Sequence, residues 1–151
     1  MDSELKPGVE TLVAQFLRED EHYLASSAVY GDCGGNAVDQ AMDLFLERPE
    51  LGFVWVGVED DRPVACCVIC FAISTSTGTL VAKLDDVYVA AGSRGQGTGS
   101  RMLSSLATEL QSIGSTRIDT AVHFENPDAK RYYLRNGFKP LNEERLSRLL
   151  Q

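Results

Sequence analysis

Residues 84–100 have the sequence LDDVYVAAGSRGQGTGS, in which an apolar, strand-like run leads into a loop rich in glycine. Behind the loop, apolar residues share one helical face: Met102, Leu103, Leu106, Ala107, Leu110 and Ile113. Glycine lets successive backbone N–H groups turn toward one point, and the start of a helix adds about half a positive charge. The stretch therefore predicts a binding site for a phosphate or diphosphate group. A tight turn without a ligand is the alternative interpretation.

The loop differs from two other phosphate-binding loops. It lacks the Gly-Lys-Ser/Thr ending of the Walker loop, which argues against a nucleoside triphosphatase. The strand before it comes late in a series of strands, whereas the dinucleotide-binding fingerprint follows the first strand of a βαβ unit.

Hydrophobic periodicity on either side of the loop predicts, in chain order, two helices, three strands, a helix, a strand, a helix and a last strand. These elements cover residues 9–17, 36–48, 52–59, 64–74, 79–89, the segment from the glycine loop to Gly114, and residues 117–122, 127–136 and 145–150. Short connections make the first three strands an antiparallel meander, and a crossover of about 25 residues allows the next strand to be parallel. The sequence therefore predicts an α/β fold (α+β mixed sheet) with helices on its faces.

The composition indicates an ordinary globular protein. The chain has 151 residues, of which 44% are apolar and 24% charged, so residues 1–151 are expected to form a single domain. Its formal net charge is −8, divided into −11 over residues 1–90 and +3 over residues 91–151. This division excludes the broad basic face of a nucleic-acid binder and suits an anionic small ligand at one end. An acidic solvated surface without a function is the alternative for the first half.

Several negative expectations follow from the sequence. The most apolar stretch, residues 52–72, is broken by charged residues, and the N-terminus is acidic, so neither a membrane span nor a signal peptide is expected and a cytoplasmic location is favoured. Cys66, Cys67 and Cys70 are interpreted as buried thiols, with no metal site. Exposed strands near the C-terminus would favour a homodimer.

Two spaced motifs resemble those of the GNAT superfamily of N-acetyltransferases. The acetyl-CoA motif Arg/Gln-x-x-Gly-x-Gly/Ala is matched by Arg94, Gly97 and Gly99. The second motif runs from an Asn to a Gly-Phe pair and is matched by Asn126, Ala129, Tyr133, Gly137 and Phe138. The resemblance is close over residues 84–138, and the predicted order of elements extends it over nearly the whole chain.

The resemblance implies that acetyl-CoA is the co-substrate. Its diphosphate would lie on the backbone of the loop, with Arg94 or Arg101 adding positive charge; the residues implied are Arg94, Gly95, Gln96, Gly97, Thr98, Gly99 and Ser100. The pantetheine arm would lie like an added strand against Val87, Tyr88 and Val89. Asn126 would reach into the cleft, although a helix cap before Pro127 is an equal alternative.

For catalysis, the motif implies Tyr133 as the acid that protonates the departing thiolate, with Tyr132 as the adjacent competitor. A backbone N–H at or near Val87 would stabilise the oxyanion. Asp85 is the first choice for the base, or for orienting a cationic substrate, and its neighbour Asp86 is expected on the opposite face of the strand. Asp86, His123 or a water molecule are the other choices for the base.

In this family the acceptor usually meets the loop between the first two helices, here residues 25–35. The candidate substrate-binding residues are Tyr30, Asp32, Asp86 and His123. The acidic first half of the chain favours a cationic small amine or a basic peptide terminus as the acceptor. Two other functions stay open: an acyl-CoA-binding module of the same fold without turnover, and an enzyme that uses another phosphate ligand.

Overall fold

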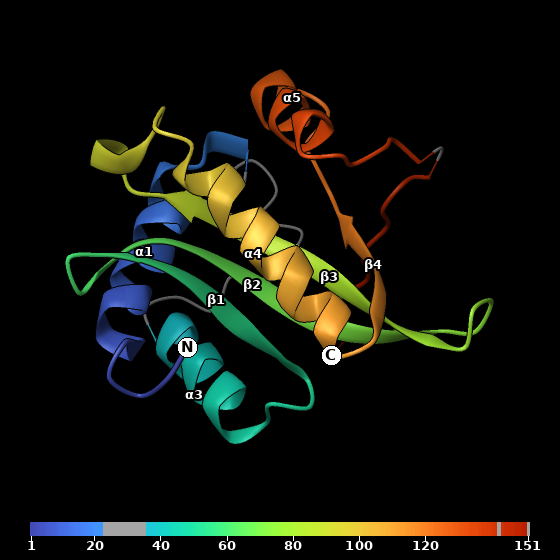
Figure 1. The fold of residues 1–151 in the computed structure, drawn as a ribbon, viewed down its shortest axis with the longest axis horizontal. Coiled ribbons are helices and arrows are strands. Elements are labelled where there is room, and N and C mark those ends of the chain that lie inside the picture. The colour runs from blue at the N-terminus through green and yellow to red at the C-terminus, as the bar shows by residue number, and fades with distance from the viewer. Residues whose placement is uncertain (23–35, 142, 151) are drawn as a thin grey trace.

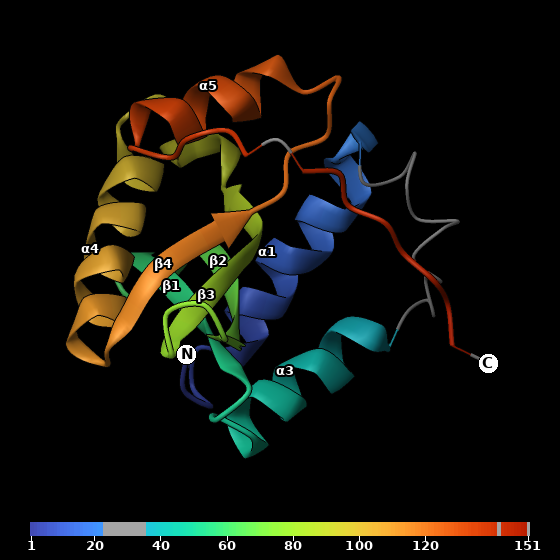
Figure 2. The same cartoon turned by 90° about the vertical axis from the view of Figure 1, so that its right-hand side faces the viewer.

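The computed structural model describes residues 1–22, 36–141 and 143–150. A four-stranded mixed sheet lies at the centre, with helices on both faces (Figures 1 and 2). Its elements are α1 (Lys6–Glu19), α3 (Ala37–Glu47), β1 (Gly52–Glu59), β2 (Arg62–Ser74), β3 (Thr79–Val89), the 3-10 helix η1 (Ala91–Ser93), α4 (Thr98–Ser112), β4 (Ser115–Thr120) and α5 (Pro127–Arg135). Within these ranges, no helix has both the length and the apolar character that a membrane span requires.

The sheet follows the order β1-β2-β3-β4. β1, β2 and β3 form an antiparallel meander, as their short connections predict. β4 runs parallel to β3, because α4 carries the chain back across the sheet between them. Both expectations about strand direction are therefore confirmed, and the fold is the mixed α/β sheet that was predicted.

Two hydrophobic cores cover the two faces of the sheet. On one face, the apolar side of α4 packs Met102, Leu103, Leu106 and Leu110 onto β2 and β3. On the other face, α1 and α3 cover the opposite side of the same strands (Figure 2). Adjacent Cys66 and Cys67 are fully buried on opposite faces, and burial raises the pKa of both thiols. The prediction of buried thiols is confirmed for Cys66 and Cys67, whereas Cys70 is a free thiol that is only partly buried.

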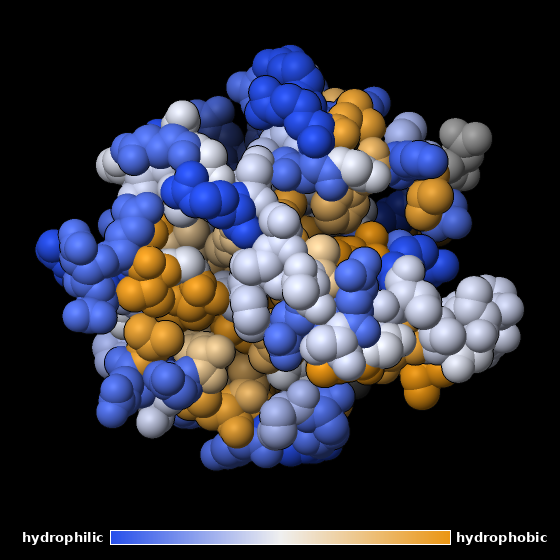
Figure 3. All heavy atoms as spheres, viewed as in Figure 1, coloured by the Kyte–Doolittle hydropathy of each residue, from blue (hydrophilic) through white to orange (hydrophobic). Residues whose placement is uncertain are grey.

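α5 is less buried than α4 and contacts the rest of the molecule mainly through aromatic rings. It has no buried residue, and hydrophilic side chains cover it at the top of the view in Figure 3. Tyr132, Tyr133 and the following Phe138 are half-buried and pack against the α4-side core. Three aromatic rings thus attach this helix to the domain.

The predicted strand at residues 145–150 is wrong. This segment pairs with no described strand, and Leu146 and Leu150 are 85% and 91% exposed. A strand persists only where a neighbour accepts and donates its backbone hydrogen bonds, which a favourable sequence pattern alone does not supply. The homodimer expectation rested on an exposed strand here and loses that basis. β4 also begins two residues earlier than predicted, at Ser115, and ends at Thr120.

The α4-side core predicts a clear difference between two leucines. Leu106 is fully buried, whereas Leu134 on α5 is 45% exposed. We expect Leu106→Ala to lower the free energy of unfolding by about 2–5 kcal/mol, because it leaves a cavity beneath α4. Leu134→Ala should change it by less than about 0.5 kcal/mol. Urea unfolding measures both, and similar losses in the two variants would contradict this assignment of the core.

Candidate active site

The parallel strands β3 and β4 are paired over only part of their length, and beyond it they separate. The last pairing between them joins Leu84 to Thr120, and the Thr120 hydroxyl donates to the Leu84 carbonyl over 3.0 Å. Beyond this point β3 continues to Val89, and no described strand pairs with its edge on the β4 side. Backbone N–H and C=O groups in this part of β3 are therefore available to a ligand that lies like a strand.

A β-bulge lies where the strands part. Cys66 and Val68 of β2 face Tyr88 and Asp85 of β3, so β3 contains one extra residue. Asp86 takes up this irregularity with a φ of 51°, a left-handed conformation that is uncommon for a residue other than glycine. Such strained positions gather at functional sites.

The bulge removes the regular alternation on which the expectation of opposite faces for Asp85 and Asp86 rested. Asp85 forms an ion pair with Lys83 at 2.7 Å, two residues away on the same side of the strand. Asp86 and Asp85 both raise the pKa of Cys70, which belongs to the core beneath α1. Strict alternation holds only in an unbulged strand, so it does not apply to the left-handed Asp86, whereas Asp85, which pairs with Val68, lies on the α1 side.

Asp86 is the carboxylate with a strongly shifted protonation equilibrium. Burial, and then the negative charge of Asp85, raise its pKa from 3.8 to about 6. Asp20 at the end of α1 acts in the same direction, while Lys83 and Arg145 oppose it. A carboxyl group poised near neutrality is suited to accepting or releasing a proton at physiological pH.

The glycine loop has the free amides that a phosphate site requires. Gly95 and Gly97 adopt left-handed conformations with φ of 73° and 80°, and Gly97 caps the start of α4. None of the backbone N–H groups of residues 95–100 donates a hydrogen bond to another described residue. The Arg101 guanidinium donates instead to the Gln96 carbonyl at 2.8 Å, which braces the loop from the opposite side.

Side chains around the loop are engaged mostly with the protein itself. Arg94 donates to the Val89 carbonyl at 2.7 Å and lies 5.1 Å over the ring of Tyr88. The Tyr88 hydroxyl donates to Glu19 of α1 at 2.9 Å, and its side chain is buried on the α1 side, so only its backbone lies at the strand edge. Sequence analysis missed Glu19, because nothing local to either segment indicates that they meet.

Glu59, at the end of β1, also fixes the loop. Its carboxylate accepts from the Ser93 hydroxyl at 3.1 Å and from the Thr98 hydroxyl at 3.4 Å. Both hydroxyls belong to buried residues. Thr98 therefore contributes its backbone to the free amides while its side chain faces Glu59.

Tyr133 lies beside the point where the strands part. Its ring packs edge-on against Phe138 at 5.2 Å, and its hydroxyl lies near enough to Thr120 for that side chain to lower the pKa of Tyr133. Burial raises the pKa of Tyr133 to about 12, partly offset by Thr120. Thr120 is the second residue that sequence analysis missed, although a polar residue at the end of a strand is a signal that would have found it.

The other predicted site residues are placed as follows. Asn126 caps α5, since its side-chain oxygen accepts from the Ala129 N–H at 2.9 Å, which confirms the cap interpretation. His123 stacks on His22 at 4.9 Å, which brings the segment after β4 against the segment after α1. The Glu125 N–H donates to His123 Nδ1 at 3.2 Å, so a neutral imidazole carries its proton on Nε2. Tyr30 and Asp32 lie outside the described residues.

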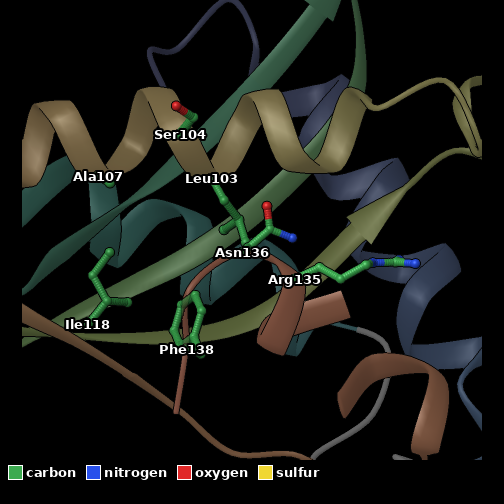
Figure 4. Close-up of a pocket in the computed structure, with 7 residues that line it drawn as sticks. All are labelled: Leu103, Ser104, Ala107, Ile118, Arg135, Asn136 and Phe138. Carbon is green, nitrogen blue, oxygen red and sulfur yellow. The ribbon is translucent and has the colours of Figure 1, made fainter. Parts of the chain in front are cut away.

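A pocket of about 410 Å³ lies between α4, β4 and the C-terminal end of α5 (Figure 4). Its lining residues are Leu103, Ser104, Ala107, Ile118, Arg135, Asn136 and Phe138. None of the predicted site residues belongs to this set, but Phe138 packs against the ring of Tyr133, so the pocket adjoins the candidate active site at that residue.

Comparison with known proteins agrees with this arrangement. The model of the acetyltransferase (GNAT) family matches residues 13–138. The chain belongs to this family. The matched range contains the parted strands, the glycine loop and α5, so the whole candidate site lies inside the GNAT region.

Solved structures share the GNAT fold of this chain. A transcriptional regulator from Bacillus halodurans superposes with a TM-score of 0.76 at 21% identity, covering 95% of this chain and 94% of the other. A Trypanosoma brucei acetyltransferase gives 0.69 at 18% identity, with 100% and 96% covered. AAC(6')-Iy, in complex with the bisubstrate analogue CoA-S-monomethyl-acetylneamine, gives 0.75 at 11% identity, with 100% and 95% covered. A search of curated proteins finds no match.

The raised pKa of Asp86 predicts a pH-dependent stability. Because its folded-state pKa of about 6 exceeds its ordinary value of 3.8, burial favours the protonated form, and the stability that Asp86 contributes falls as pH rises from about 4 to 6. Asp86→Asn removes this titration. We expect the free energy of unfolding of the variant to rise relative to that of the parent over this pH interval, by up to about 3 kcal/mol above pH 6.

Denaturant unfolding at several pH values between 4 and 7 measures this gain. Asp61→Asn is the matched control, because Asp61 has a similar left-handed backbone with φ of 59° but is exposed. Its effect should be independent of pH. An equally pH-independent difference for Asp86→Asn would contradict the raised pKa.

Proposed function

We propose that this GNAT chain is an N-acetyltransferase that moves the acetyl group of acetyl-CoA to a primary amine of a small molecule or peptide by direct attack. The main observation behind the proposal is that two neighbouring segments have backbone groups without hydrogen-bond partners among the described residues. The free N–H groups of residues 95–100 follow directly on the unpaired edge of β3. Buried or clustered backbone groups normally find partners, so this surface is suited to a ligand that supplies them.

Acetyl-CoA offers chemical groups that fit both surfaces. Its diphosphate would take the free amides of Gly95, Gln96, Gly97, Thr98, Gly99 and Ser100, where the start of α4 adds its partial positive charge. The pantetheine amides would pair with the edge of β3 along Val87, Tyr88 and Val89. Arg94 and Arg101 add positive charge near the diphosphate, although both are held by backbone carbonyls in the free protein.

The chemistry follows from this placement. The amine nitrogen attacks the thioester carbon, a backbone N–H at or near Val87 stabilises the oxyanion, and the bond from carbon to sulfur breaks. Tyr133 protonates the departing thiolate. Its pKa of about 12 lies above that of a thiol, near 8.5, so the phenol stays neutral until charge builds on sulfur and then donates to it.

The structure favours Asp86 over Asp85 for receiving the proton that the amine loses. Asp85 is already paired with Lys83, whereas Asp86 has a pKa near the working pH. His123 fits this role less well, because its unprotonated Nδ1 already accepts from the Glu125 N–H. Asp85 and Asp86 together make the bulge beside the parted strands acidic, which supports a cationic amine as the acceptor.

The proposal predicts that one substitution lowers the turnover number and leaves the affinity for acetyl-CoA nearly unchanged. Tyr133→Phe should lower the turnover number by about 10²-fold or more, because the thiolate then departs without an acid. Affinity for acetyl-CoA, measured by calorimetric titration, should change little. Thiol release in the presence of polyamines, aminoglycosides and peptides with free N-termini measures turnover and identifies the acceptor.

Two outcomes would contradict the proposal. Wild-type protein that binds acetyl-CoA but releases no thiol with any amine would be an acyl-CoA-binding module without turnover. Wild-type protein that binds a nucleotide without competition from coenzyme A would use another phosphate ligand.

A further inference from the structure

Three aromatic rings form a continuous stack where the segment after α1 meets the segment after β4. The rings of His22 and His123 lie 4.9 Å apart and are inclined by 26°, and those of His123 and Phe124 lie 4.7 Å apart and are inclined by 23°. His22 and His123 are half-buried, whereas Phe124 is 88% exposed. One face of the Phe124 ring lies against His123, so its other face is open and can stack with a further ring.

Hydrogen bonds fix the short turn that carries Phe124. The Glu125 N–H donates to His123 Nδ1 at 3.2 Å, and the Asn126 N–H donates to the His123 carbonyl at 2.9 Å. The Asn126 side chain in turn caps α5. The turn is thus held by His22 on one side and by α5 on the other, which lowers the entropy cost of binding a ligand to the ring.

The stack lies on the same side of the parted strands as Asp86. β3 and β4 run parallel and are last paired at Leu84 and Thr120, so Asp86 and the stack both follow this pair, on the two chains that separate. The end of α1 approaches both, because Asp20 is near enough to raise the pKa of Asp86, and His22 belongs to the stack. Figures 1 and 2 show the end of α1 beside the chain that leaves β4. The carboxylate and the exposed ring therefore border the same region.

This region combines negative charge with an aromatic surface. Asp85 and Asp86 supply the charge, while Lys83, which is paired with Asp85, and Arg145 are the cations that act on Asp86. A cationic amine is attracted to the carboxylates, and an aromatic group is attracted to the open face of Phe124. A ligand that uses both features has an amine and an aromatic ring joined by a linker.

We propose that the acceptor is a primary amine that carries an aromatic ring, and that Phe124 binds this ring by stacking on it. The inference rests on the proposed function, because it takes the amine to react where the strands part. It narrows the class of acceptor, since polyamines and aminoglycosides have no aromatic ring. Phe124 acts in binding alone and takes no part in proton transfer.

A series of paired amines tests the role of the ring. Phenylalkylamines with one to four methylene groups between ring and nitrogen are each compared with the cyclohexyl amine of the same length, which is similarly bulky and apolar but not aromatic. For at least one length, kcat/KM of the wild type should favour the phenyl amine by about threefold to tenfold, the effect of one stacked pair of rings. The difference should lie in KM, because the stack is the same in the ground state and the transition state.

Phe124→Leu removes the ring and keeps an apolar side chain. The ratio of kcat/KM between the phenyl and cyclohexyl amines should fall to about one, and comparing two amines within one variant cancels any general loss of activity. The melting temperature should change by less than about 2 °C, because the ring is exposed. Ile73→Ala is the control: Ile73 is 78% exposed at the end of the β2–β3 hairpin remote from the glycine loop, and the variant should keep the ratio of the wild type.

Binding gives a readout that does not depend on turnover. The same amines are titrated calorimetrically into protein saturated with coenzyme A. The phenyl amine of the favoured length should bind about threefold to tenfold more tightly than its cyclohexyl counterpart, and Phe124→Leu should abolish this difference.

The failures of the two proposals are distinguishable. Wild-type protein that releases no thiol with any amine would overturn the proposed function and, with it, the aromatic acceptor. Wild-type protein that acetylates amines without preferring the phenyl compound at any length would overturn the aromatic acceptor alone. A preference that Phe124→Leu retains, or faster acetylation of polyamines than of every phenyl amine, would do the same.

Discussion

The candidate site depends on one break in backbone pairing, the parting of β3 and β4 after Leu84 and Thr120. If the two strands were paired along their whole length, neither would have unpaired backbone N–H and C=O groups in the middle of the sheet. Here the Thr120 hydroxyl donates a hydrogen bond to the Leu84 carbonyl where the pairing stops, and the bulge at Asp86 lies just beyond this point on β3. The continuation of β3 then delivers the chain directly into the glycine loop and α4.

The parted strands separate two electrostatic environments. On the α4 side, free amides and the start of a helix present positive potential to a ligand. At the bulge, Asp85 and Asp86 lie next to each other, and Asp20 at the end of α1 is near enough to raise the pKa of Asp86. Under the proposed function, the free amides would attract the anionic cofactor and the two carboxylates a cationic acceptor, which would give a physical meaning to the uneven charge of the two halves of the sequence.

Local sequence patterns predicted most of the fold and part of the site. The glycine loop, the meander, the parallel crossover and the Asn126 cap are set by neighbouring residues and were recoverable. The faces of Asp85 and Asp86 were not, because alternation fails at a bulge that only pairing with β2 reveals. The bond from Tyr88 to Glu19, and the stack of His22 on His123, join segments far apart in the chain. The prediction of a C-terminal strand was wrong for the same reason, since no strand among the described residues pairs with residues 145–150.

The two adjacent cysteines of β2 have a consequence for a protein that handles a thioester. Only a thiolate attacks an acyl carbon or binds a metal readily. Burial raises the pKa of Cys66 to about 12, and that of Cys67, which lies near enough to affect Tyr133, is raised as well. Both sulfurs therefore stay protonated in the interior, and under the proposed function neither would react with the acyl group of bound acetyl-CoA.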